Sequence, residues 1–422
     1  MNTLLLVTDQ PFWRRENGSQ QRSWALLQFL KSQGFRATCF YMVPLTDSDI
    51  LATRELGLQI VAFDPNGSWF AKRVHGIANM FGRRRRKAKR PASQAAGVSK
   101  SPPGTLQTYR WPAAAAQFQK LVARLHPDLV LCNYVIWGNL LEAFPSGQRP
   151  FLAVVDTQDV LHQRQQSFSR YGADHWIEIT RDEEAQALGL FDLILAAQAD
   201  EAKTLRAMVP EVDVVQVGHD HDRHARPDVI DPQRRLPDAP VRIGMIGSGN
   251  AANRDGLRWF IDEVWNNGLS AQNVELLVAG SLSSEMDGPT DSGAPQVRCL
   301  GVVQPLDAFY DQVDVVINPI RFGSGIKIKT IEAFRFGKPL VVHPHSTQGL
   351  SEAAKEAVLV ADTAAEFSAA CQRLVDSAAM RREMSQRMLQ FDRTELSAKS
   401  VYSDLVAWLR EHDLCVASGR PA

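Results

Sequence analysis

The sequence predicts an α/β fold in which two doubly wound, Rossmann-like domains face one another across a cleft. Three observations lead to this prediction: short apolar runs alternate with longer amphipathic stretches, the alternation stops in a polar stretch, and it then starts again. Apolar runs rich in β-branched residues and separated by helical patterns are typical of βαβ units with parallel sheets. A length of 422 residues is sufficient for two or three domains.

The first domain is expected to span residues 1–218. Its strands are predicted at seven apolar runs, residues 3–8, 36–43, 58–63, 128–133, 151–157, 193–198 and 212–218. The stretch 219–240 has several prolines, many charges and no periodicity, so we expect it to be an interdomain linker.

The second domain is expected to span residues 241–395. Its strands are predicted at six apolar runs, residues 241–247, 274–280, 297–301, 313–319, 339–344 and 357–362. Residues 396–422 have a helical pattern, and we expect this C-terminal helix to pack back on the first domain. Ligands of such folds bind at the carboxyl ends of the strands, so the cleft is the expected site.

A basic insert at residues 69–108 interrupts the first domain. Residues 69–100 contain ten Lys or Arg and no Asp or Glu, which leaves 37 basic against 47 acidic residues elsewhere. A helical apolar stripe from Phe70 to Phe81 followed by a polybasic stretch predicts binding of residues 69–90 to an anionic membrane surface, with a flexible linker after it. A helix that packs on its own domain remains an alternative. Nucleic acid is not expected, because no recognisable module surrounds the insert.

The expected location is the cytoplasm, with peripheral attachment to the inner face of the membrane. The five cysteines are scattered without CxxC spacing, which favours a reducing compartment. No stretch approaches the roughly 20 apolar residues of a membrane span, and the N-terminus is interpreted as a strand rather than a signal peptide. His219, His221 and His224 match no zinc spacing, so we expect no metal and no cofactor.

The stretch "RFGSGIKIKTIEAFRFGKPLVV", residues 321–342, predicts an anion site. It follows a predicted strand and opens a helix that we expect from Gly325 to Phe336. Helix N-termini offer unpaired N–H groups, and glycines allow a ligand to approach the backbone closely. Lys327 and Lys329 are expected in the first turn, where cations oppose the helix dipole unless an anion is present. The alternative is a tight turn with solvated lysines.

Two neighbouring features suggest that the anion belongs to a nucleotide. Glu332, about one and a half turns beyond Lys327, offers a carboxylate that suits ribose hydroxyls. In "GMIGSGNAA", Gly247, Gly249 and Ala252 match the GxGxxA pattern of a dinucleotide site directly after a predicted strand, and Gly247 and Ser248 are candidate donor-binding residues. The next strand lacks the acid that a nicotinamide site requires, so we interpret this loop as a second turn lining the cleft.

Candidate residues of the first domain follow two of its strands. Gly18 and Ser19 in "ENGSQQR" follow the first strand and a short loop and are candidate residues of the cleft, with helix capping by Ser19 as the alternative. Asp156 and Asp159 follow the strand at 151–157 and are candidate catalytic residues. Capping of the next helix by Asp159 is the alternative.

The second half resembles the retaining GT-B glycosyltransferases of the glycosyltransferase 4 (group 1) family. The resemblance covers roughly residues 240–395 through "IGSGNAANRDGLRWFIDEV", "VELLVAGS", the "VRCLG" to "KPLVV" stretch and "STQGL". In the first half, "VVDTQDVLHQR" is similar to the D-x-H-D-V segment of that family. The resemblance implies GT-B architecture, a nucleotide-diphosphate sugar as donor and no required metal.

The resemblance also implies roles for individual residues. Glu332 matches the second glutamate of the family's E-x7-E pattern, which holds the donor ribose. Lys327 matches the basic residue that neutralises the charge of the donor diphosphate. Gly323, Ser324 and Gly325 match the loop that presents backbone N–H groups to the donor phosphate or sugar. Gly18 and Ser19 stand where the family has a glycine-containing loop that borders the acceptor and the donor phosphate. Ser324 stands where the first glutamate of the pattern is expected, and Gln158 replaces the histidine of D-x-H-D.

The predicted function is that of a glycosyltransferase of the hexosyltransferase type, which moves a sugar with retention to a hydroxyl of a glycan or lipid-linked acceptor. Surface polysaccharide or glycolipid assembly is the expected pathway class. Two alternatives remain open: a nucleotide-sugar epimerase with the same fold, and a catalytically degenerate protein that binds nucleotide sugars.

Overall fold

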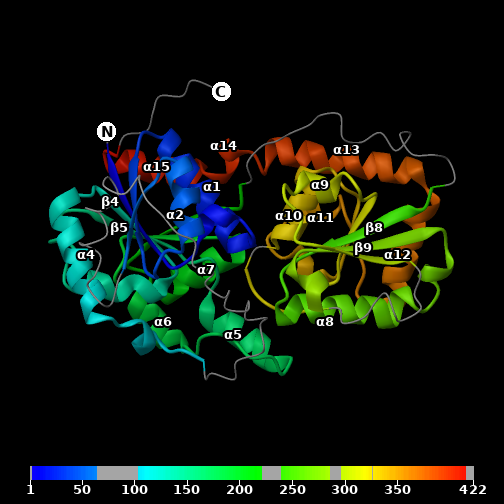
Figure 1. Cartoon of the computed structure of the whole chain (residues 1–422), viewed down its shortest axis with the longest axis horizontal. Helices are drawn as coiled ribbons and strands as arrows, with labels where there is room; N and C mark the ends of the chain where they lie inside the picture. The colour runs from blue at the N-terminus through cyan, green and yellow to red at the C-terminus, as the bar shows by residue number, and fades with distance from the viewer. Residues whose placement is uncertain (1, 64–102, 221–238, 286–295, 326, 415–422) are drawn as a thin grey trace, which may run out of the picture.

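The chain forms two α/β domains, each built around one parallel sheet with helices on both faces (Figure 1). The computed structural model describes residues 2–63, 103–220, 239–285, 296–325 and 327–414. The predicted class, two doubly wound Rossmann-like domains, is confirmed. Among the described helices, none is long and apolar enough to span a bilayer.

The N-terminal sheet has seven strands in the order β3-β2-β1-β4-β5-β6-β7, and every neighbouring pair is parallel. Its strands are β1 (Thr3–Thr8), β2 (Arg36–Tyr41), β3 (Gln59–Ala62), β4 (Leu129–Asn133), β5 (Leu152–Asp156), β6 (Leu193–Ala196) and β7 (Asp213–Gln216). The strand order reverses between β1 and β4, so the loops after these strands diverge and open a crevice at the carboxyl edge.

The C-terminal sheet has six parallel strands in the order β10-β9-β8-β11-β12-β13. Its strands are β8 (Val241–Ile246), β9 (Val274–Ala279), β10 (Val297–Gly301), β11 (Val315–Asn318), β12 (Leu340–Val342) and β13 (Leu359–Val360). The order reverses between β8 and β11, which gives this domain a second crevice at its carboxyl edge.

Helices cover both faces of the N-terminal sheet because its apolar strands bury side chains on both sides. The helices are α1 (Gly18–Ser32), α2 (Asp47–Glu55), α4 (Pro112–Leu125), α5 (Leu161–Arg170), α6 (Arg181–Leu188) and α7 (Ala199–Met208), with the shorter η1 (Phe12–Arg14), η3 (Leu106–Tyr109) and η4 (Val135–Leu141). The helix α1 packs on one face, and α4 and α6 pack on the other.

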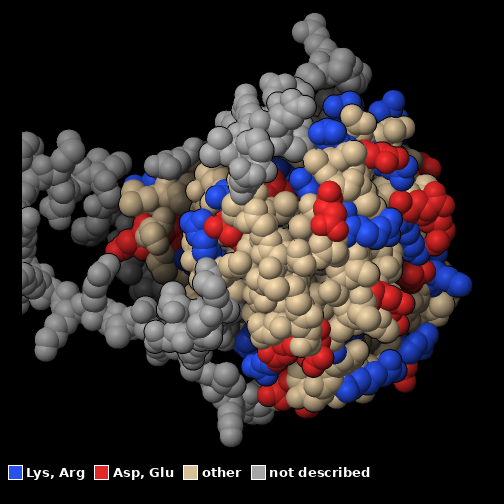
Figure 2. Space-filling model, turned by 90° about the vertical axis from the view of Figure 1, so that its right-hand side faces the viewer, with Lys and Arg blue, Asp and Glu red and all other residues tan. Residues whose placement is uncertain are grey.

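The C-terminal sheet is covered in the same way and shares one apolar core with its helices. They are α8 (Ala251–Trp259), α9 (Asp307–Tyr310), α10 (Ile328–Arg335), α11 (Glu352–Lys355), α12 (Ala364–Asp376) and α13 (Ala378–Thr394), with the shorter η6 (Phe260–Trp265), η7 (Leu269–Ala271), η8 (Ser281–Glu285) and η9 (Pro344–Thr347). Figure 2 views the end face of this domain, where basic and acidic side chains alternate around an uncharged centre. This face therefore carries no patch of a single charge.

After α13 the chain crosses back to the N-terminal domain, where α14 (Ala398–Val401) and α15 (Ser403–Glu411) lie close to α1 (Figure 1). The ring of Tyr402 stacks on that of Phe29 with 3.8 Å between centroids. The indole of Trp408 donates to Asp213 Oδ2 at 2.8 Å. These contacts attach the end of the described chain to the first domain.

Parts of the sequence interpretation fall outside the described residues or differ from the structure. The basic helix expected within residues 69–90 lies outside them, and so does most of the linker expected at 219–240. The flexible insert was expected to extend to residue 108, but η3 occupies its end, and Tyr109 packs edge-on against Trp137 at 5.6 Å. Aromatic packing therefore orders the end of the insert, which a Ser, Pro and Gly-rich composition alone does not predict.

Candidate functional site

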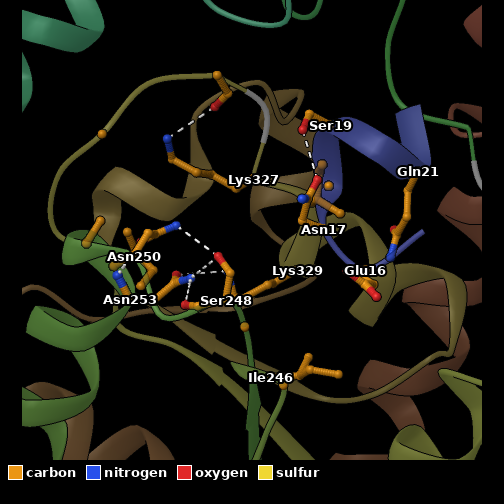
Figure 3. A pocket seen from close by; sticks show the side chains of 18 of the residues that line it. Glu16, Asn17, Ser19, Gln21, Ile246, Ser248, Asn250, Asn253, Lys327 and Lys329 are labelled. Atoms are coloured by element: carbon orange, nitrogen blue, oxygen red, sulfur yellow. Dashed lines mark hydrogen bonds between the residues drawn. The ribbon is translucent and has the colours of Figure 1, made fainter. Parts of the chain in front are cut away.

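A cavity of about 520 Å³ lies between the two domains and is lined by residues of both. The loops after β1, β4, β8 and β11 all contribute to its wall. These four strands flank the points where the strand order of each sheet reverses, so the cavity lies at the carboxyl ends of both sheets. Figure 3 shows Asn17 and Ser19 of the N-terminal domain on one side of the cavity and Ser248 and Asn253 of the C-terminal domain on the other. The expected position of the site in the cleft agrees with this geometry.

The loop before α10 is the first wall of the cavity. The helix was expected from Gly325, but α10 begins at Ile328 and Lys327 occupies the N-cap position. Gly323 at φ +118° and Gly325 at φ +72° adopt left-handed backbone conformations, which only glycine enters readily and which are incompatible with a helix. Lys327 Nζ donates to the carbonyls of Ser324 and Gly325, both at 3.1 Å. The lysine therefore holds the loop in shape and lies at the helix N-terminus.

Burial lowers the pKa of Lys327 to about 8, and the nearby cations Arg164 and Lys329 add to this effect. The carboxylates of Asp159 and Glu201 act in the opposite direction. A bound anion would raise the pKa of this lysine again, because a nearby negative charge stabilises the protonated form that burial disfavours.

Lys329 lies in the first turn of α10 as expected, and it connects this helix to the loop after β8. Its Nζ donates to Asn253 Oδ1 at 3.0 Å, and Asn253 Nδ2 donates to the carbonyl of Ser248 at 2.7 Å (Figure 3). A side chain at Gly247 would lie 2.8 Å from Lys329 Cε, so the glycine leaves the path of the lysine open. Burial lowers the pKa of Lys329.

Glu332 is buried in the wall of the cavity with its carboxylate held in place. The hydroxyl of Tyr310 donates to Glu332 Oε2 at 2.8 Å, and the Tyr310 ring stacks on Phe336 at 4.2 Å. Burial, together with the charge of Glu332, raises the pKa of Tyr310 well above its usual value, so the hydroxyl remains a donor. The arrangement presents a carboxylate of fixed orientation to hydroxyl groups in the cavity.

The start of α1 lies against the start of α10 at the wall of the cavity. The N-cap of α1 is Asn17, whose side chain accepts from the Gln20 amide at 3.0 Å, while Ser19 Oγ donates to Asn17 Oδ1 at 2.9 Å. Capping by Ser19 is therefore wrong. A side chain at Gly18 would collide with Ile328, the first residue of α10, so glycine allows the close approach of the two helix N-termini. Both positive dipole ends act on the same space.

The structure does not bring Asp156 to the cavity. Asp156 is fully buried at the end of β5, where Arg22 Nε donates to its Oδ1 at 2.9 Å and Gln158 Nε2 donates to its Oδ2 at 2.7 Å. Arg22 Nη1 also donates to the carbonyl of Val217 at 2.8 Å. These contacts connect α1 and the residue after β7 to β5, so the role of Asp156 is to stabilise the fold.

Asp159, three residues later, does line the cavity. Its Oδ1 accepts from Ser324 Oγ at 2.8 Å and its Oδ2 accepts from Arg164 at 2.9 Å. Capping of α5 by Asp159 is wrong, because the N-cap residue is Val160 and the first amides of the helix donate to Glu184. The turn that separates Asp159 from Asp156 passes through Gln158 in the left-handed region at φ +62°.

Several cavity residues have no counterpart in the sequence interpretation: Arg15, Asn17, Arg22, Tyr134, Asn253 and Gln304. Arg164, five residues after Asp159, also lines the cavity and is the arginine of the "VVDTQDVLHQR" stretch, to which no role was assigned. Tyr134 reaches the site through a left-handed backbone at φ +68°, which no sequence pattern signals.

Glu201 was also missed. This buried residue of α7 lies beside the cavity, and burial, together with the charge of Asp159, raises its pKa to about 8.

The described residues contain no cluster of three or more His, Cys, Asp or Glu side chains that could hold a metal ion. His221 and His224 of the expected linker lie outside them, whereas His219 is described and buried.

Residues 240–377 match the family model of the group 1 glycosyl transferases. No curated protein sequence matches the chain. Sucrose-phosphate synthase from Thermosynechococcus elongatus is similar in structure, with a TM-score of 0.67 at 13% identity, over 98% of this chain and 99% of that one. Anabaena HepE in complex with UDP has a TM-score of 0.64 at 12% identity, over 97% and 100% of the two chains.

A Listeria monocytogenes protein described as a candidate UDP-N-acetylglucosamine 2-epimerase is also similar, with a TM-score of 0.54 at 10% identity over 99% and 98% of the chains. At these identities the likeness establishes the fold. The predicted GT-B architecture is thereby confirmed.

Proposed function

We propose that the chain transfers a sugar from a nucleotide-diphosphate sugar to an acceptor hydroxyl, which is supported by the match of residues 240–377 to the group 1 glycosyl transferases and by the two-domain fold. The observation that carries this proposal is the joint placement of two helix N-termini, two lysines and one oriented carboxylate in a single interdomain cavity. Each of these groups suits one part of a nucleotide sugar.

The diphosphate is assigned to the space between the starts of α1 and α10. Unpaired backbone N–H groups and the positive ends of both helices favour an anion there, and Lys327 and Lys329 add positive charge. The reaction releases a nucleoside diphosphate, so negative charge grows on the leaving oxygen as the anomeric bond breaks. Cations and amides already aimed at that oxygen lower the barrier without reorganisation.

The nucleoside is assigned to the pocket wall around Glu332. A carboxylate accepts hydrogen bonds from two neighbouring hydroxyls, and the Tyr310 contact keeps it pointed in one direction. Donor charge is met by lysines and backbone amides, so the proposed reaction requires no metal. Full activity in the presence of a chelator is the expected result.

The acceptor is assigned to the N-terminal side of the cavity, near Gly18 and Ser19. We propose a glycan or lipid-linked acceptor, in surface polysaccharide or glycolipid assembly, and retention of the anomeric configuration. The polybasic composition of residues 69–90 supports an acceptor at an anionic membrane. Proton NMR of the product formed from a donor of known configuration tests the retention directly.

A second candidate function is nucleotide-sugar epimerisation. It is favoured by the likeness to the Listeria protein. A third candidate is a protein that binds nucleotide sugars without turnover, which is favoured by Ser324 and Gln158 standing at the positions of an expected glutamate and an expected histidine.

One experiment separates these three functions. The purified chain is incubated with UDP-, GDP-, ADP- and dTDP-sugars, with and without glycan acceptors, and the products are resolved by mass spectrometry and NMR. Slow donor hydrolysis that acceptors accelerate supports transfer. Interconversion of donor sugars supports epimerisation and contradicts the main proposal, as does binding with no turnover under any condition.

A further inference from the structure

Asp159 is a carboxylate of one domain that lies against the phosphate loop of the other. It is 165 residues away from Ser324 in sequence, yet its Oδ1 accepts from Ser324 Oγ at 2.8 Å. A side chain at Gly325 would collide with the same oxygen. The absence of a Cβ at this position therefore allows the carboxylate to reach the backbone of the loop.

A second set of contacts holds Asp159 in this position. Arg164 donates to Asp159 Oδ2 at 2.9 Å, and its guanidinium lies 5.1 Å from the centre of the Phe168 ring. Phe168 in turn packs edge-on against Phe322 of the C-terminal domain at 5.4 Å. The amide of Gly323 donates to Ser167 Oγ at 2.9 Å. The loop and the carboxylate are thus fixed to each other from both sides.

The donor sugar must lie close to this carboxylate if the proposed function is correct. The sugar is bonded directly to the second phosphate of the donor, so it occupies the space next to the phosphate loop. Asp159 touches that loop, lines the cavity and is only 7% exposed. Each oxygen of an ionised carboxylate has two acceptor sites, and the contacts with Ser324 and Arg164 use one on each oxygen. Acceptor capacity therefore remains for sugar hydroxyls.

We propose that Asp159 recognises the hydroxyls of the donor sugar, with Ser324 and Arg164 as its positioning residues. The inference rests on the proposed function and deepens it by assigning sugar selectivity to the N-terminal domain. The contact forms only when the two domains are together, because its parts belong to different domains. Sugar recognition and domain closure are therefore coupled.

The test compares two ligands that differ only in the sugar. Calorimetry of the full chain measures the affinity for a nucleoside diphosphate and for the matching nucleotide sugar, such as UDP and UDP-glucose. The pairs based on UDP, GDP, ADP and dTDP are all measured. Asp159→Asn keeps the side-chain shape and removes the charge. We expect roughly 10- to 100-fold weaker binding of the nucleotide sugar from the loss of charge-assisted hydrogen bonds. The charge of Asp159 also acts on Lys327, and this effect is common to both ligands. We therefore expect the affinity for the nucleotide sugar relative to that for the nucleoside diphosphate to fall by at least about tenfold, and retained diphosphate binding shows that the variant is folded.

Deoxy donor analogues identify the contact itself. Removal of the recognised hydroxyl from the sugar should weaken binding to the wild-type chain and have no further effect on Asp159→Asn, as expected for two halves of one interaction. The control variant Asp182→Asn removes a carboxylate whose side chain is 95% exposed on α6, and it should bind both ligands as the wild type does.

Two further outcomes separate the inference from the proposed function. Equal losses of both ligands in Asp159→Asn, or an unchanged nucleotide-sugar affinity, overturn the inference and leave the proposed function standing. A wild-type chain that binds none of the nucleoside diphosphates overturns both.

Discussion

Replacement of Asp156 by Asn should destabilise the N-terminal domain and should not remove a catalytic group. The side chains of Arg22 and Asp156 are 3% and 0% exposed, so the pair is isolated from water. In Asp156→Asn, the guanidinium keeps its bond to the Val217 carbonyl but loses the carboxylate that neutralises it. An uncompensated buried charge of this kind costs about 3–5 kcal/mol of unfolding free energy.

The magnitude can be checked by urea unfolding followed by circular dichroism and tryptophan fluorescence. A matched double variant, Arg22→Met with Asp156→Leu, removes both charges and should lose less stability than Asp156→Asn alone, because no unpaired charge remains. Turnover of the folded single variant at low temperature should stay within about tenfold of wild type, since Asp156 does not line the cavity. A stability loss below about 1 kcal/mol together with a 100-fold loss of kcat would refute this reasoning.

Three further predictions concern the cavity and the insert. Burial lowers the pKa of Lys327 to about 8, so nucleoside diphosphate affinity should be highest below pH 8 and should fall by up to about tenfold between pH 7 and pH 9. The variant Lys327→Arg should flatten this pH profile, as measured by calorimetry. Glu332→Ala should weaken nucleoside diphosphate binding by roughly 10- to 100-fold but leave inorganic diphosphate binding nearly unchanged; equal effects on both ligands contradict the ribose assignment. Deletion of residues 69–100 should abolish sedimentation with vesicles of phosphatidylglycerol while preserving nucleotide affinity, and retained vesicle binding would exclude the membrane role of the insert.

The sign of the pH effect follows from the groups that face Lys327. A bound anion favours the protonated form of Lys327. The anion therefore binds tightly below the pKa of Lys327, and above that pKa its affinity lacks the contribution of the lysine charge. Glu201, with a pKa of about 8, ionises over the same range and adds negative charge beside the anion. Both changes weaken binding as the pH rises. The nearby cations Arg164 and Lys329 lower the pKa of Lys327 further.

The sequence by itself determined the fold class and pointed to the candidate site residues of the C-terminal domain. Strand positions followed from apolar runs, and the loop that we propose to bind phosphate followed from glycines before a helix with two early lysines. These features are local: the periodicity of buried side chains and the conformational freedom of glycine act over a few residues. The position of Glu332 could be predicted in the same way, because its spacing from Lys327 in the sequence sets the turn of α10 on which it lies.

Only the tertiary structure decided between groups that are equivalent in sequence. Asp156 and Asp159 both follow β5, but a left-handed turn at Gln158 separates them, so one is buried against Arg22 and the other lines the cavity. The contact between Asp159 and Ser324 joins two domains and depends on the glycine at 325 that lets them approach. Local pattern sets which elements form, whereas the packing of one domain on the other sets which of their side chains meet. The contact of Asp159 with Ser324, which we propose to lie at the donor sugar, is of this second kind.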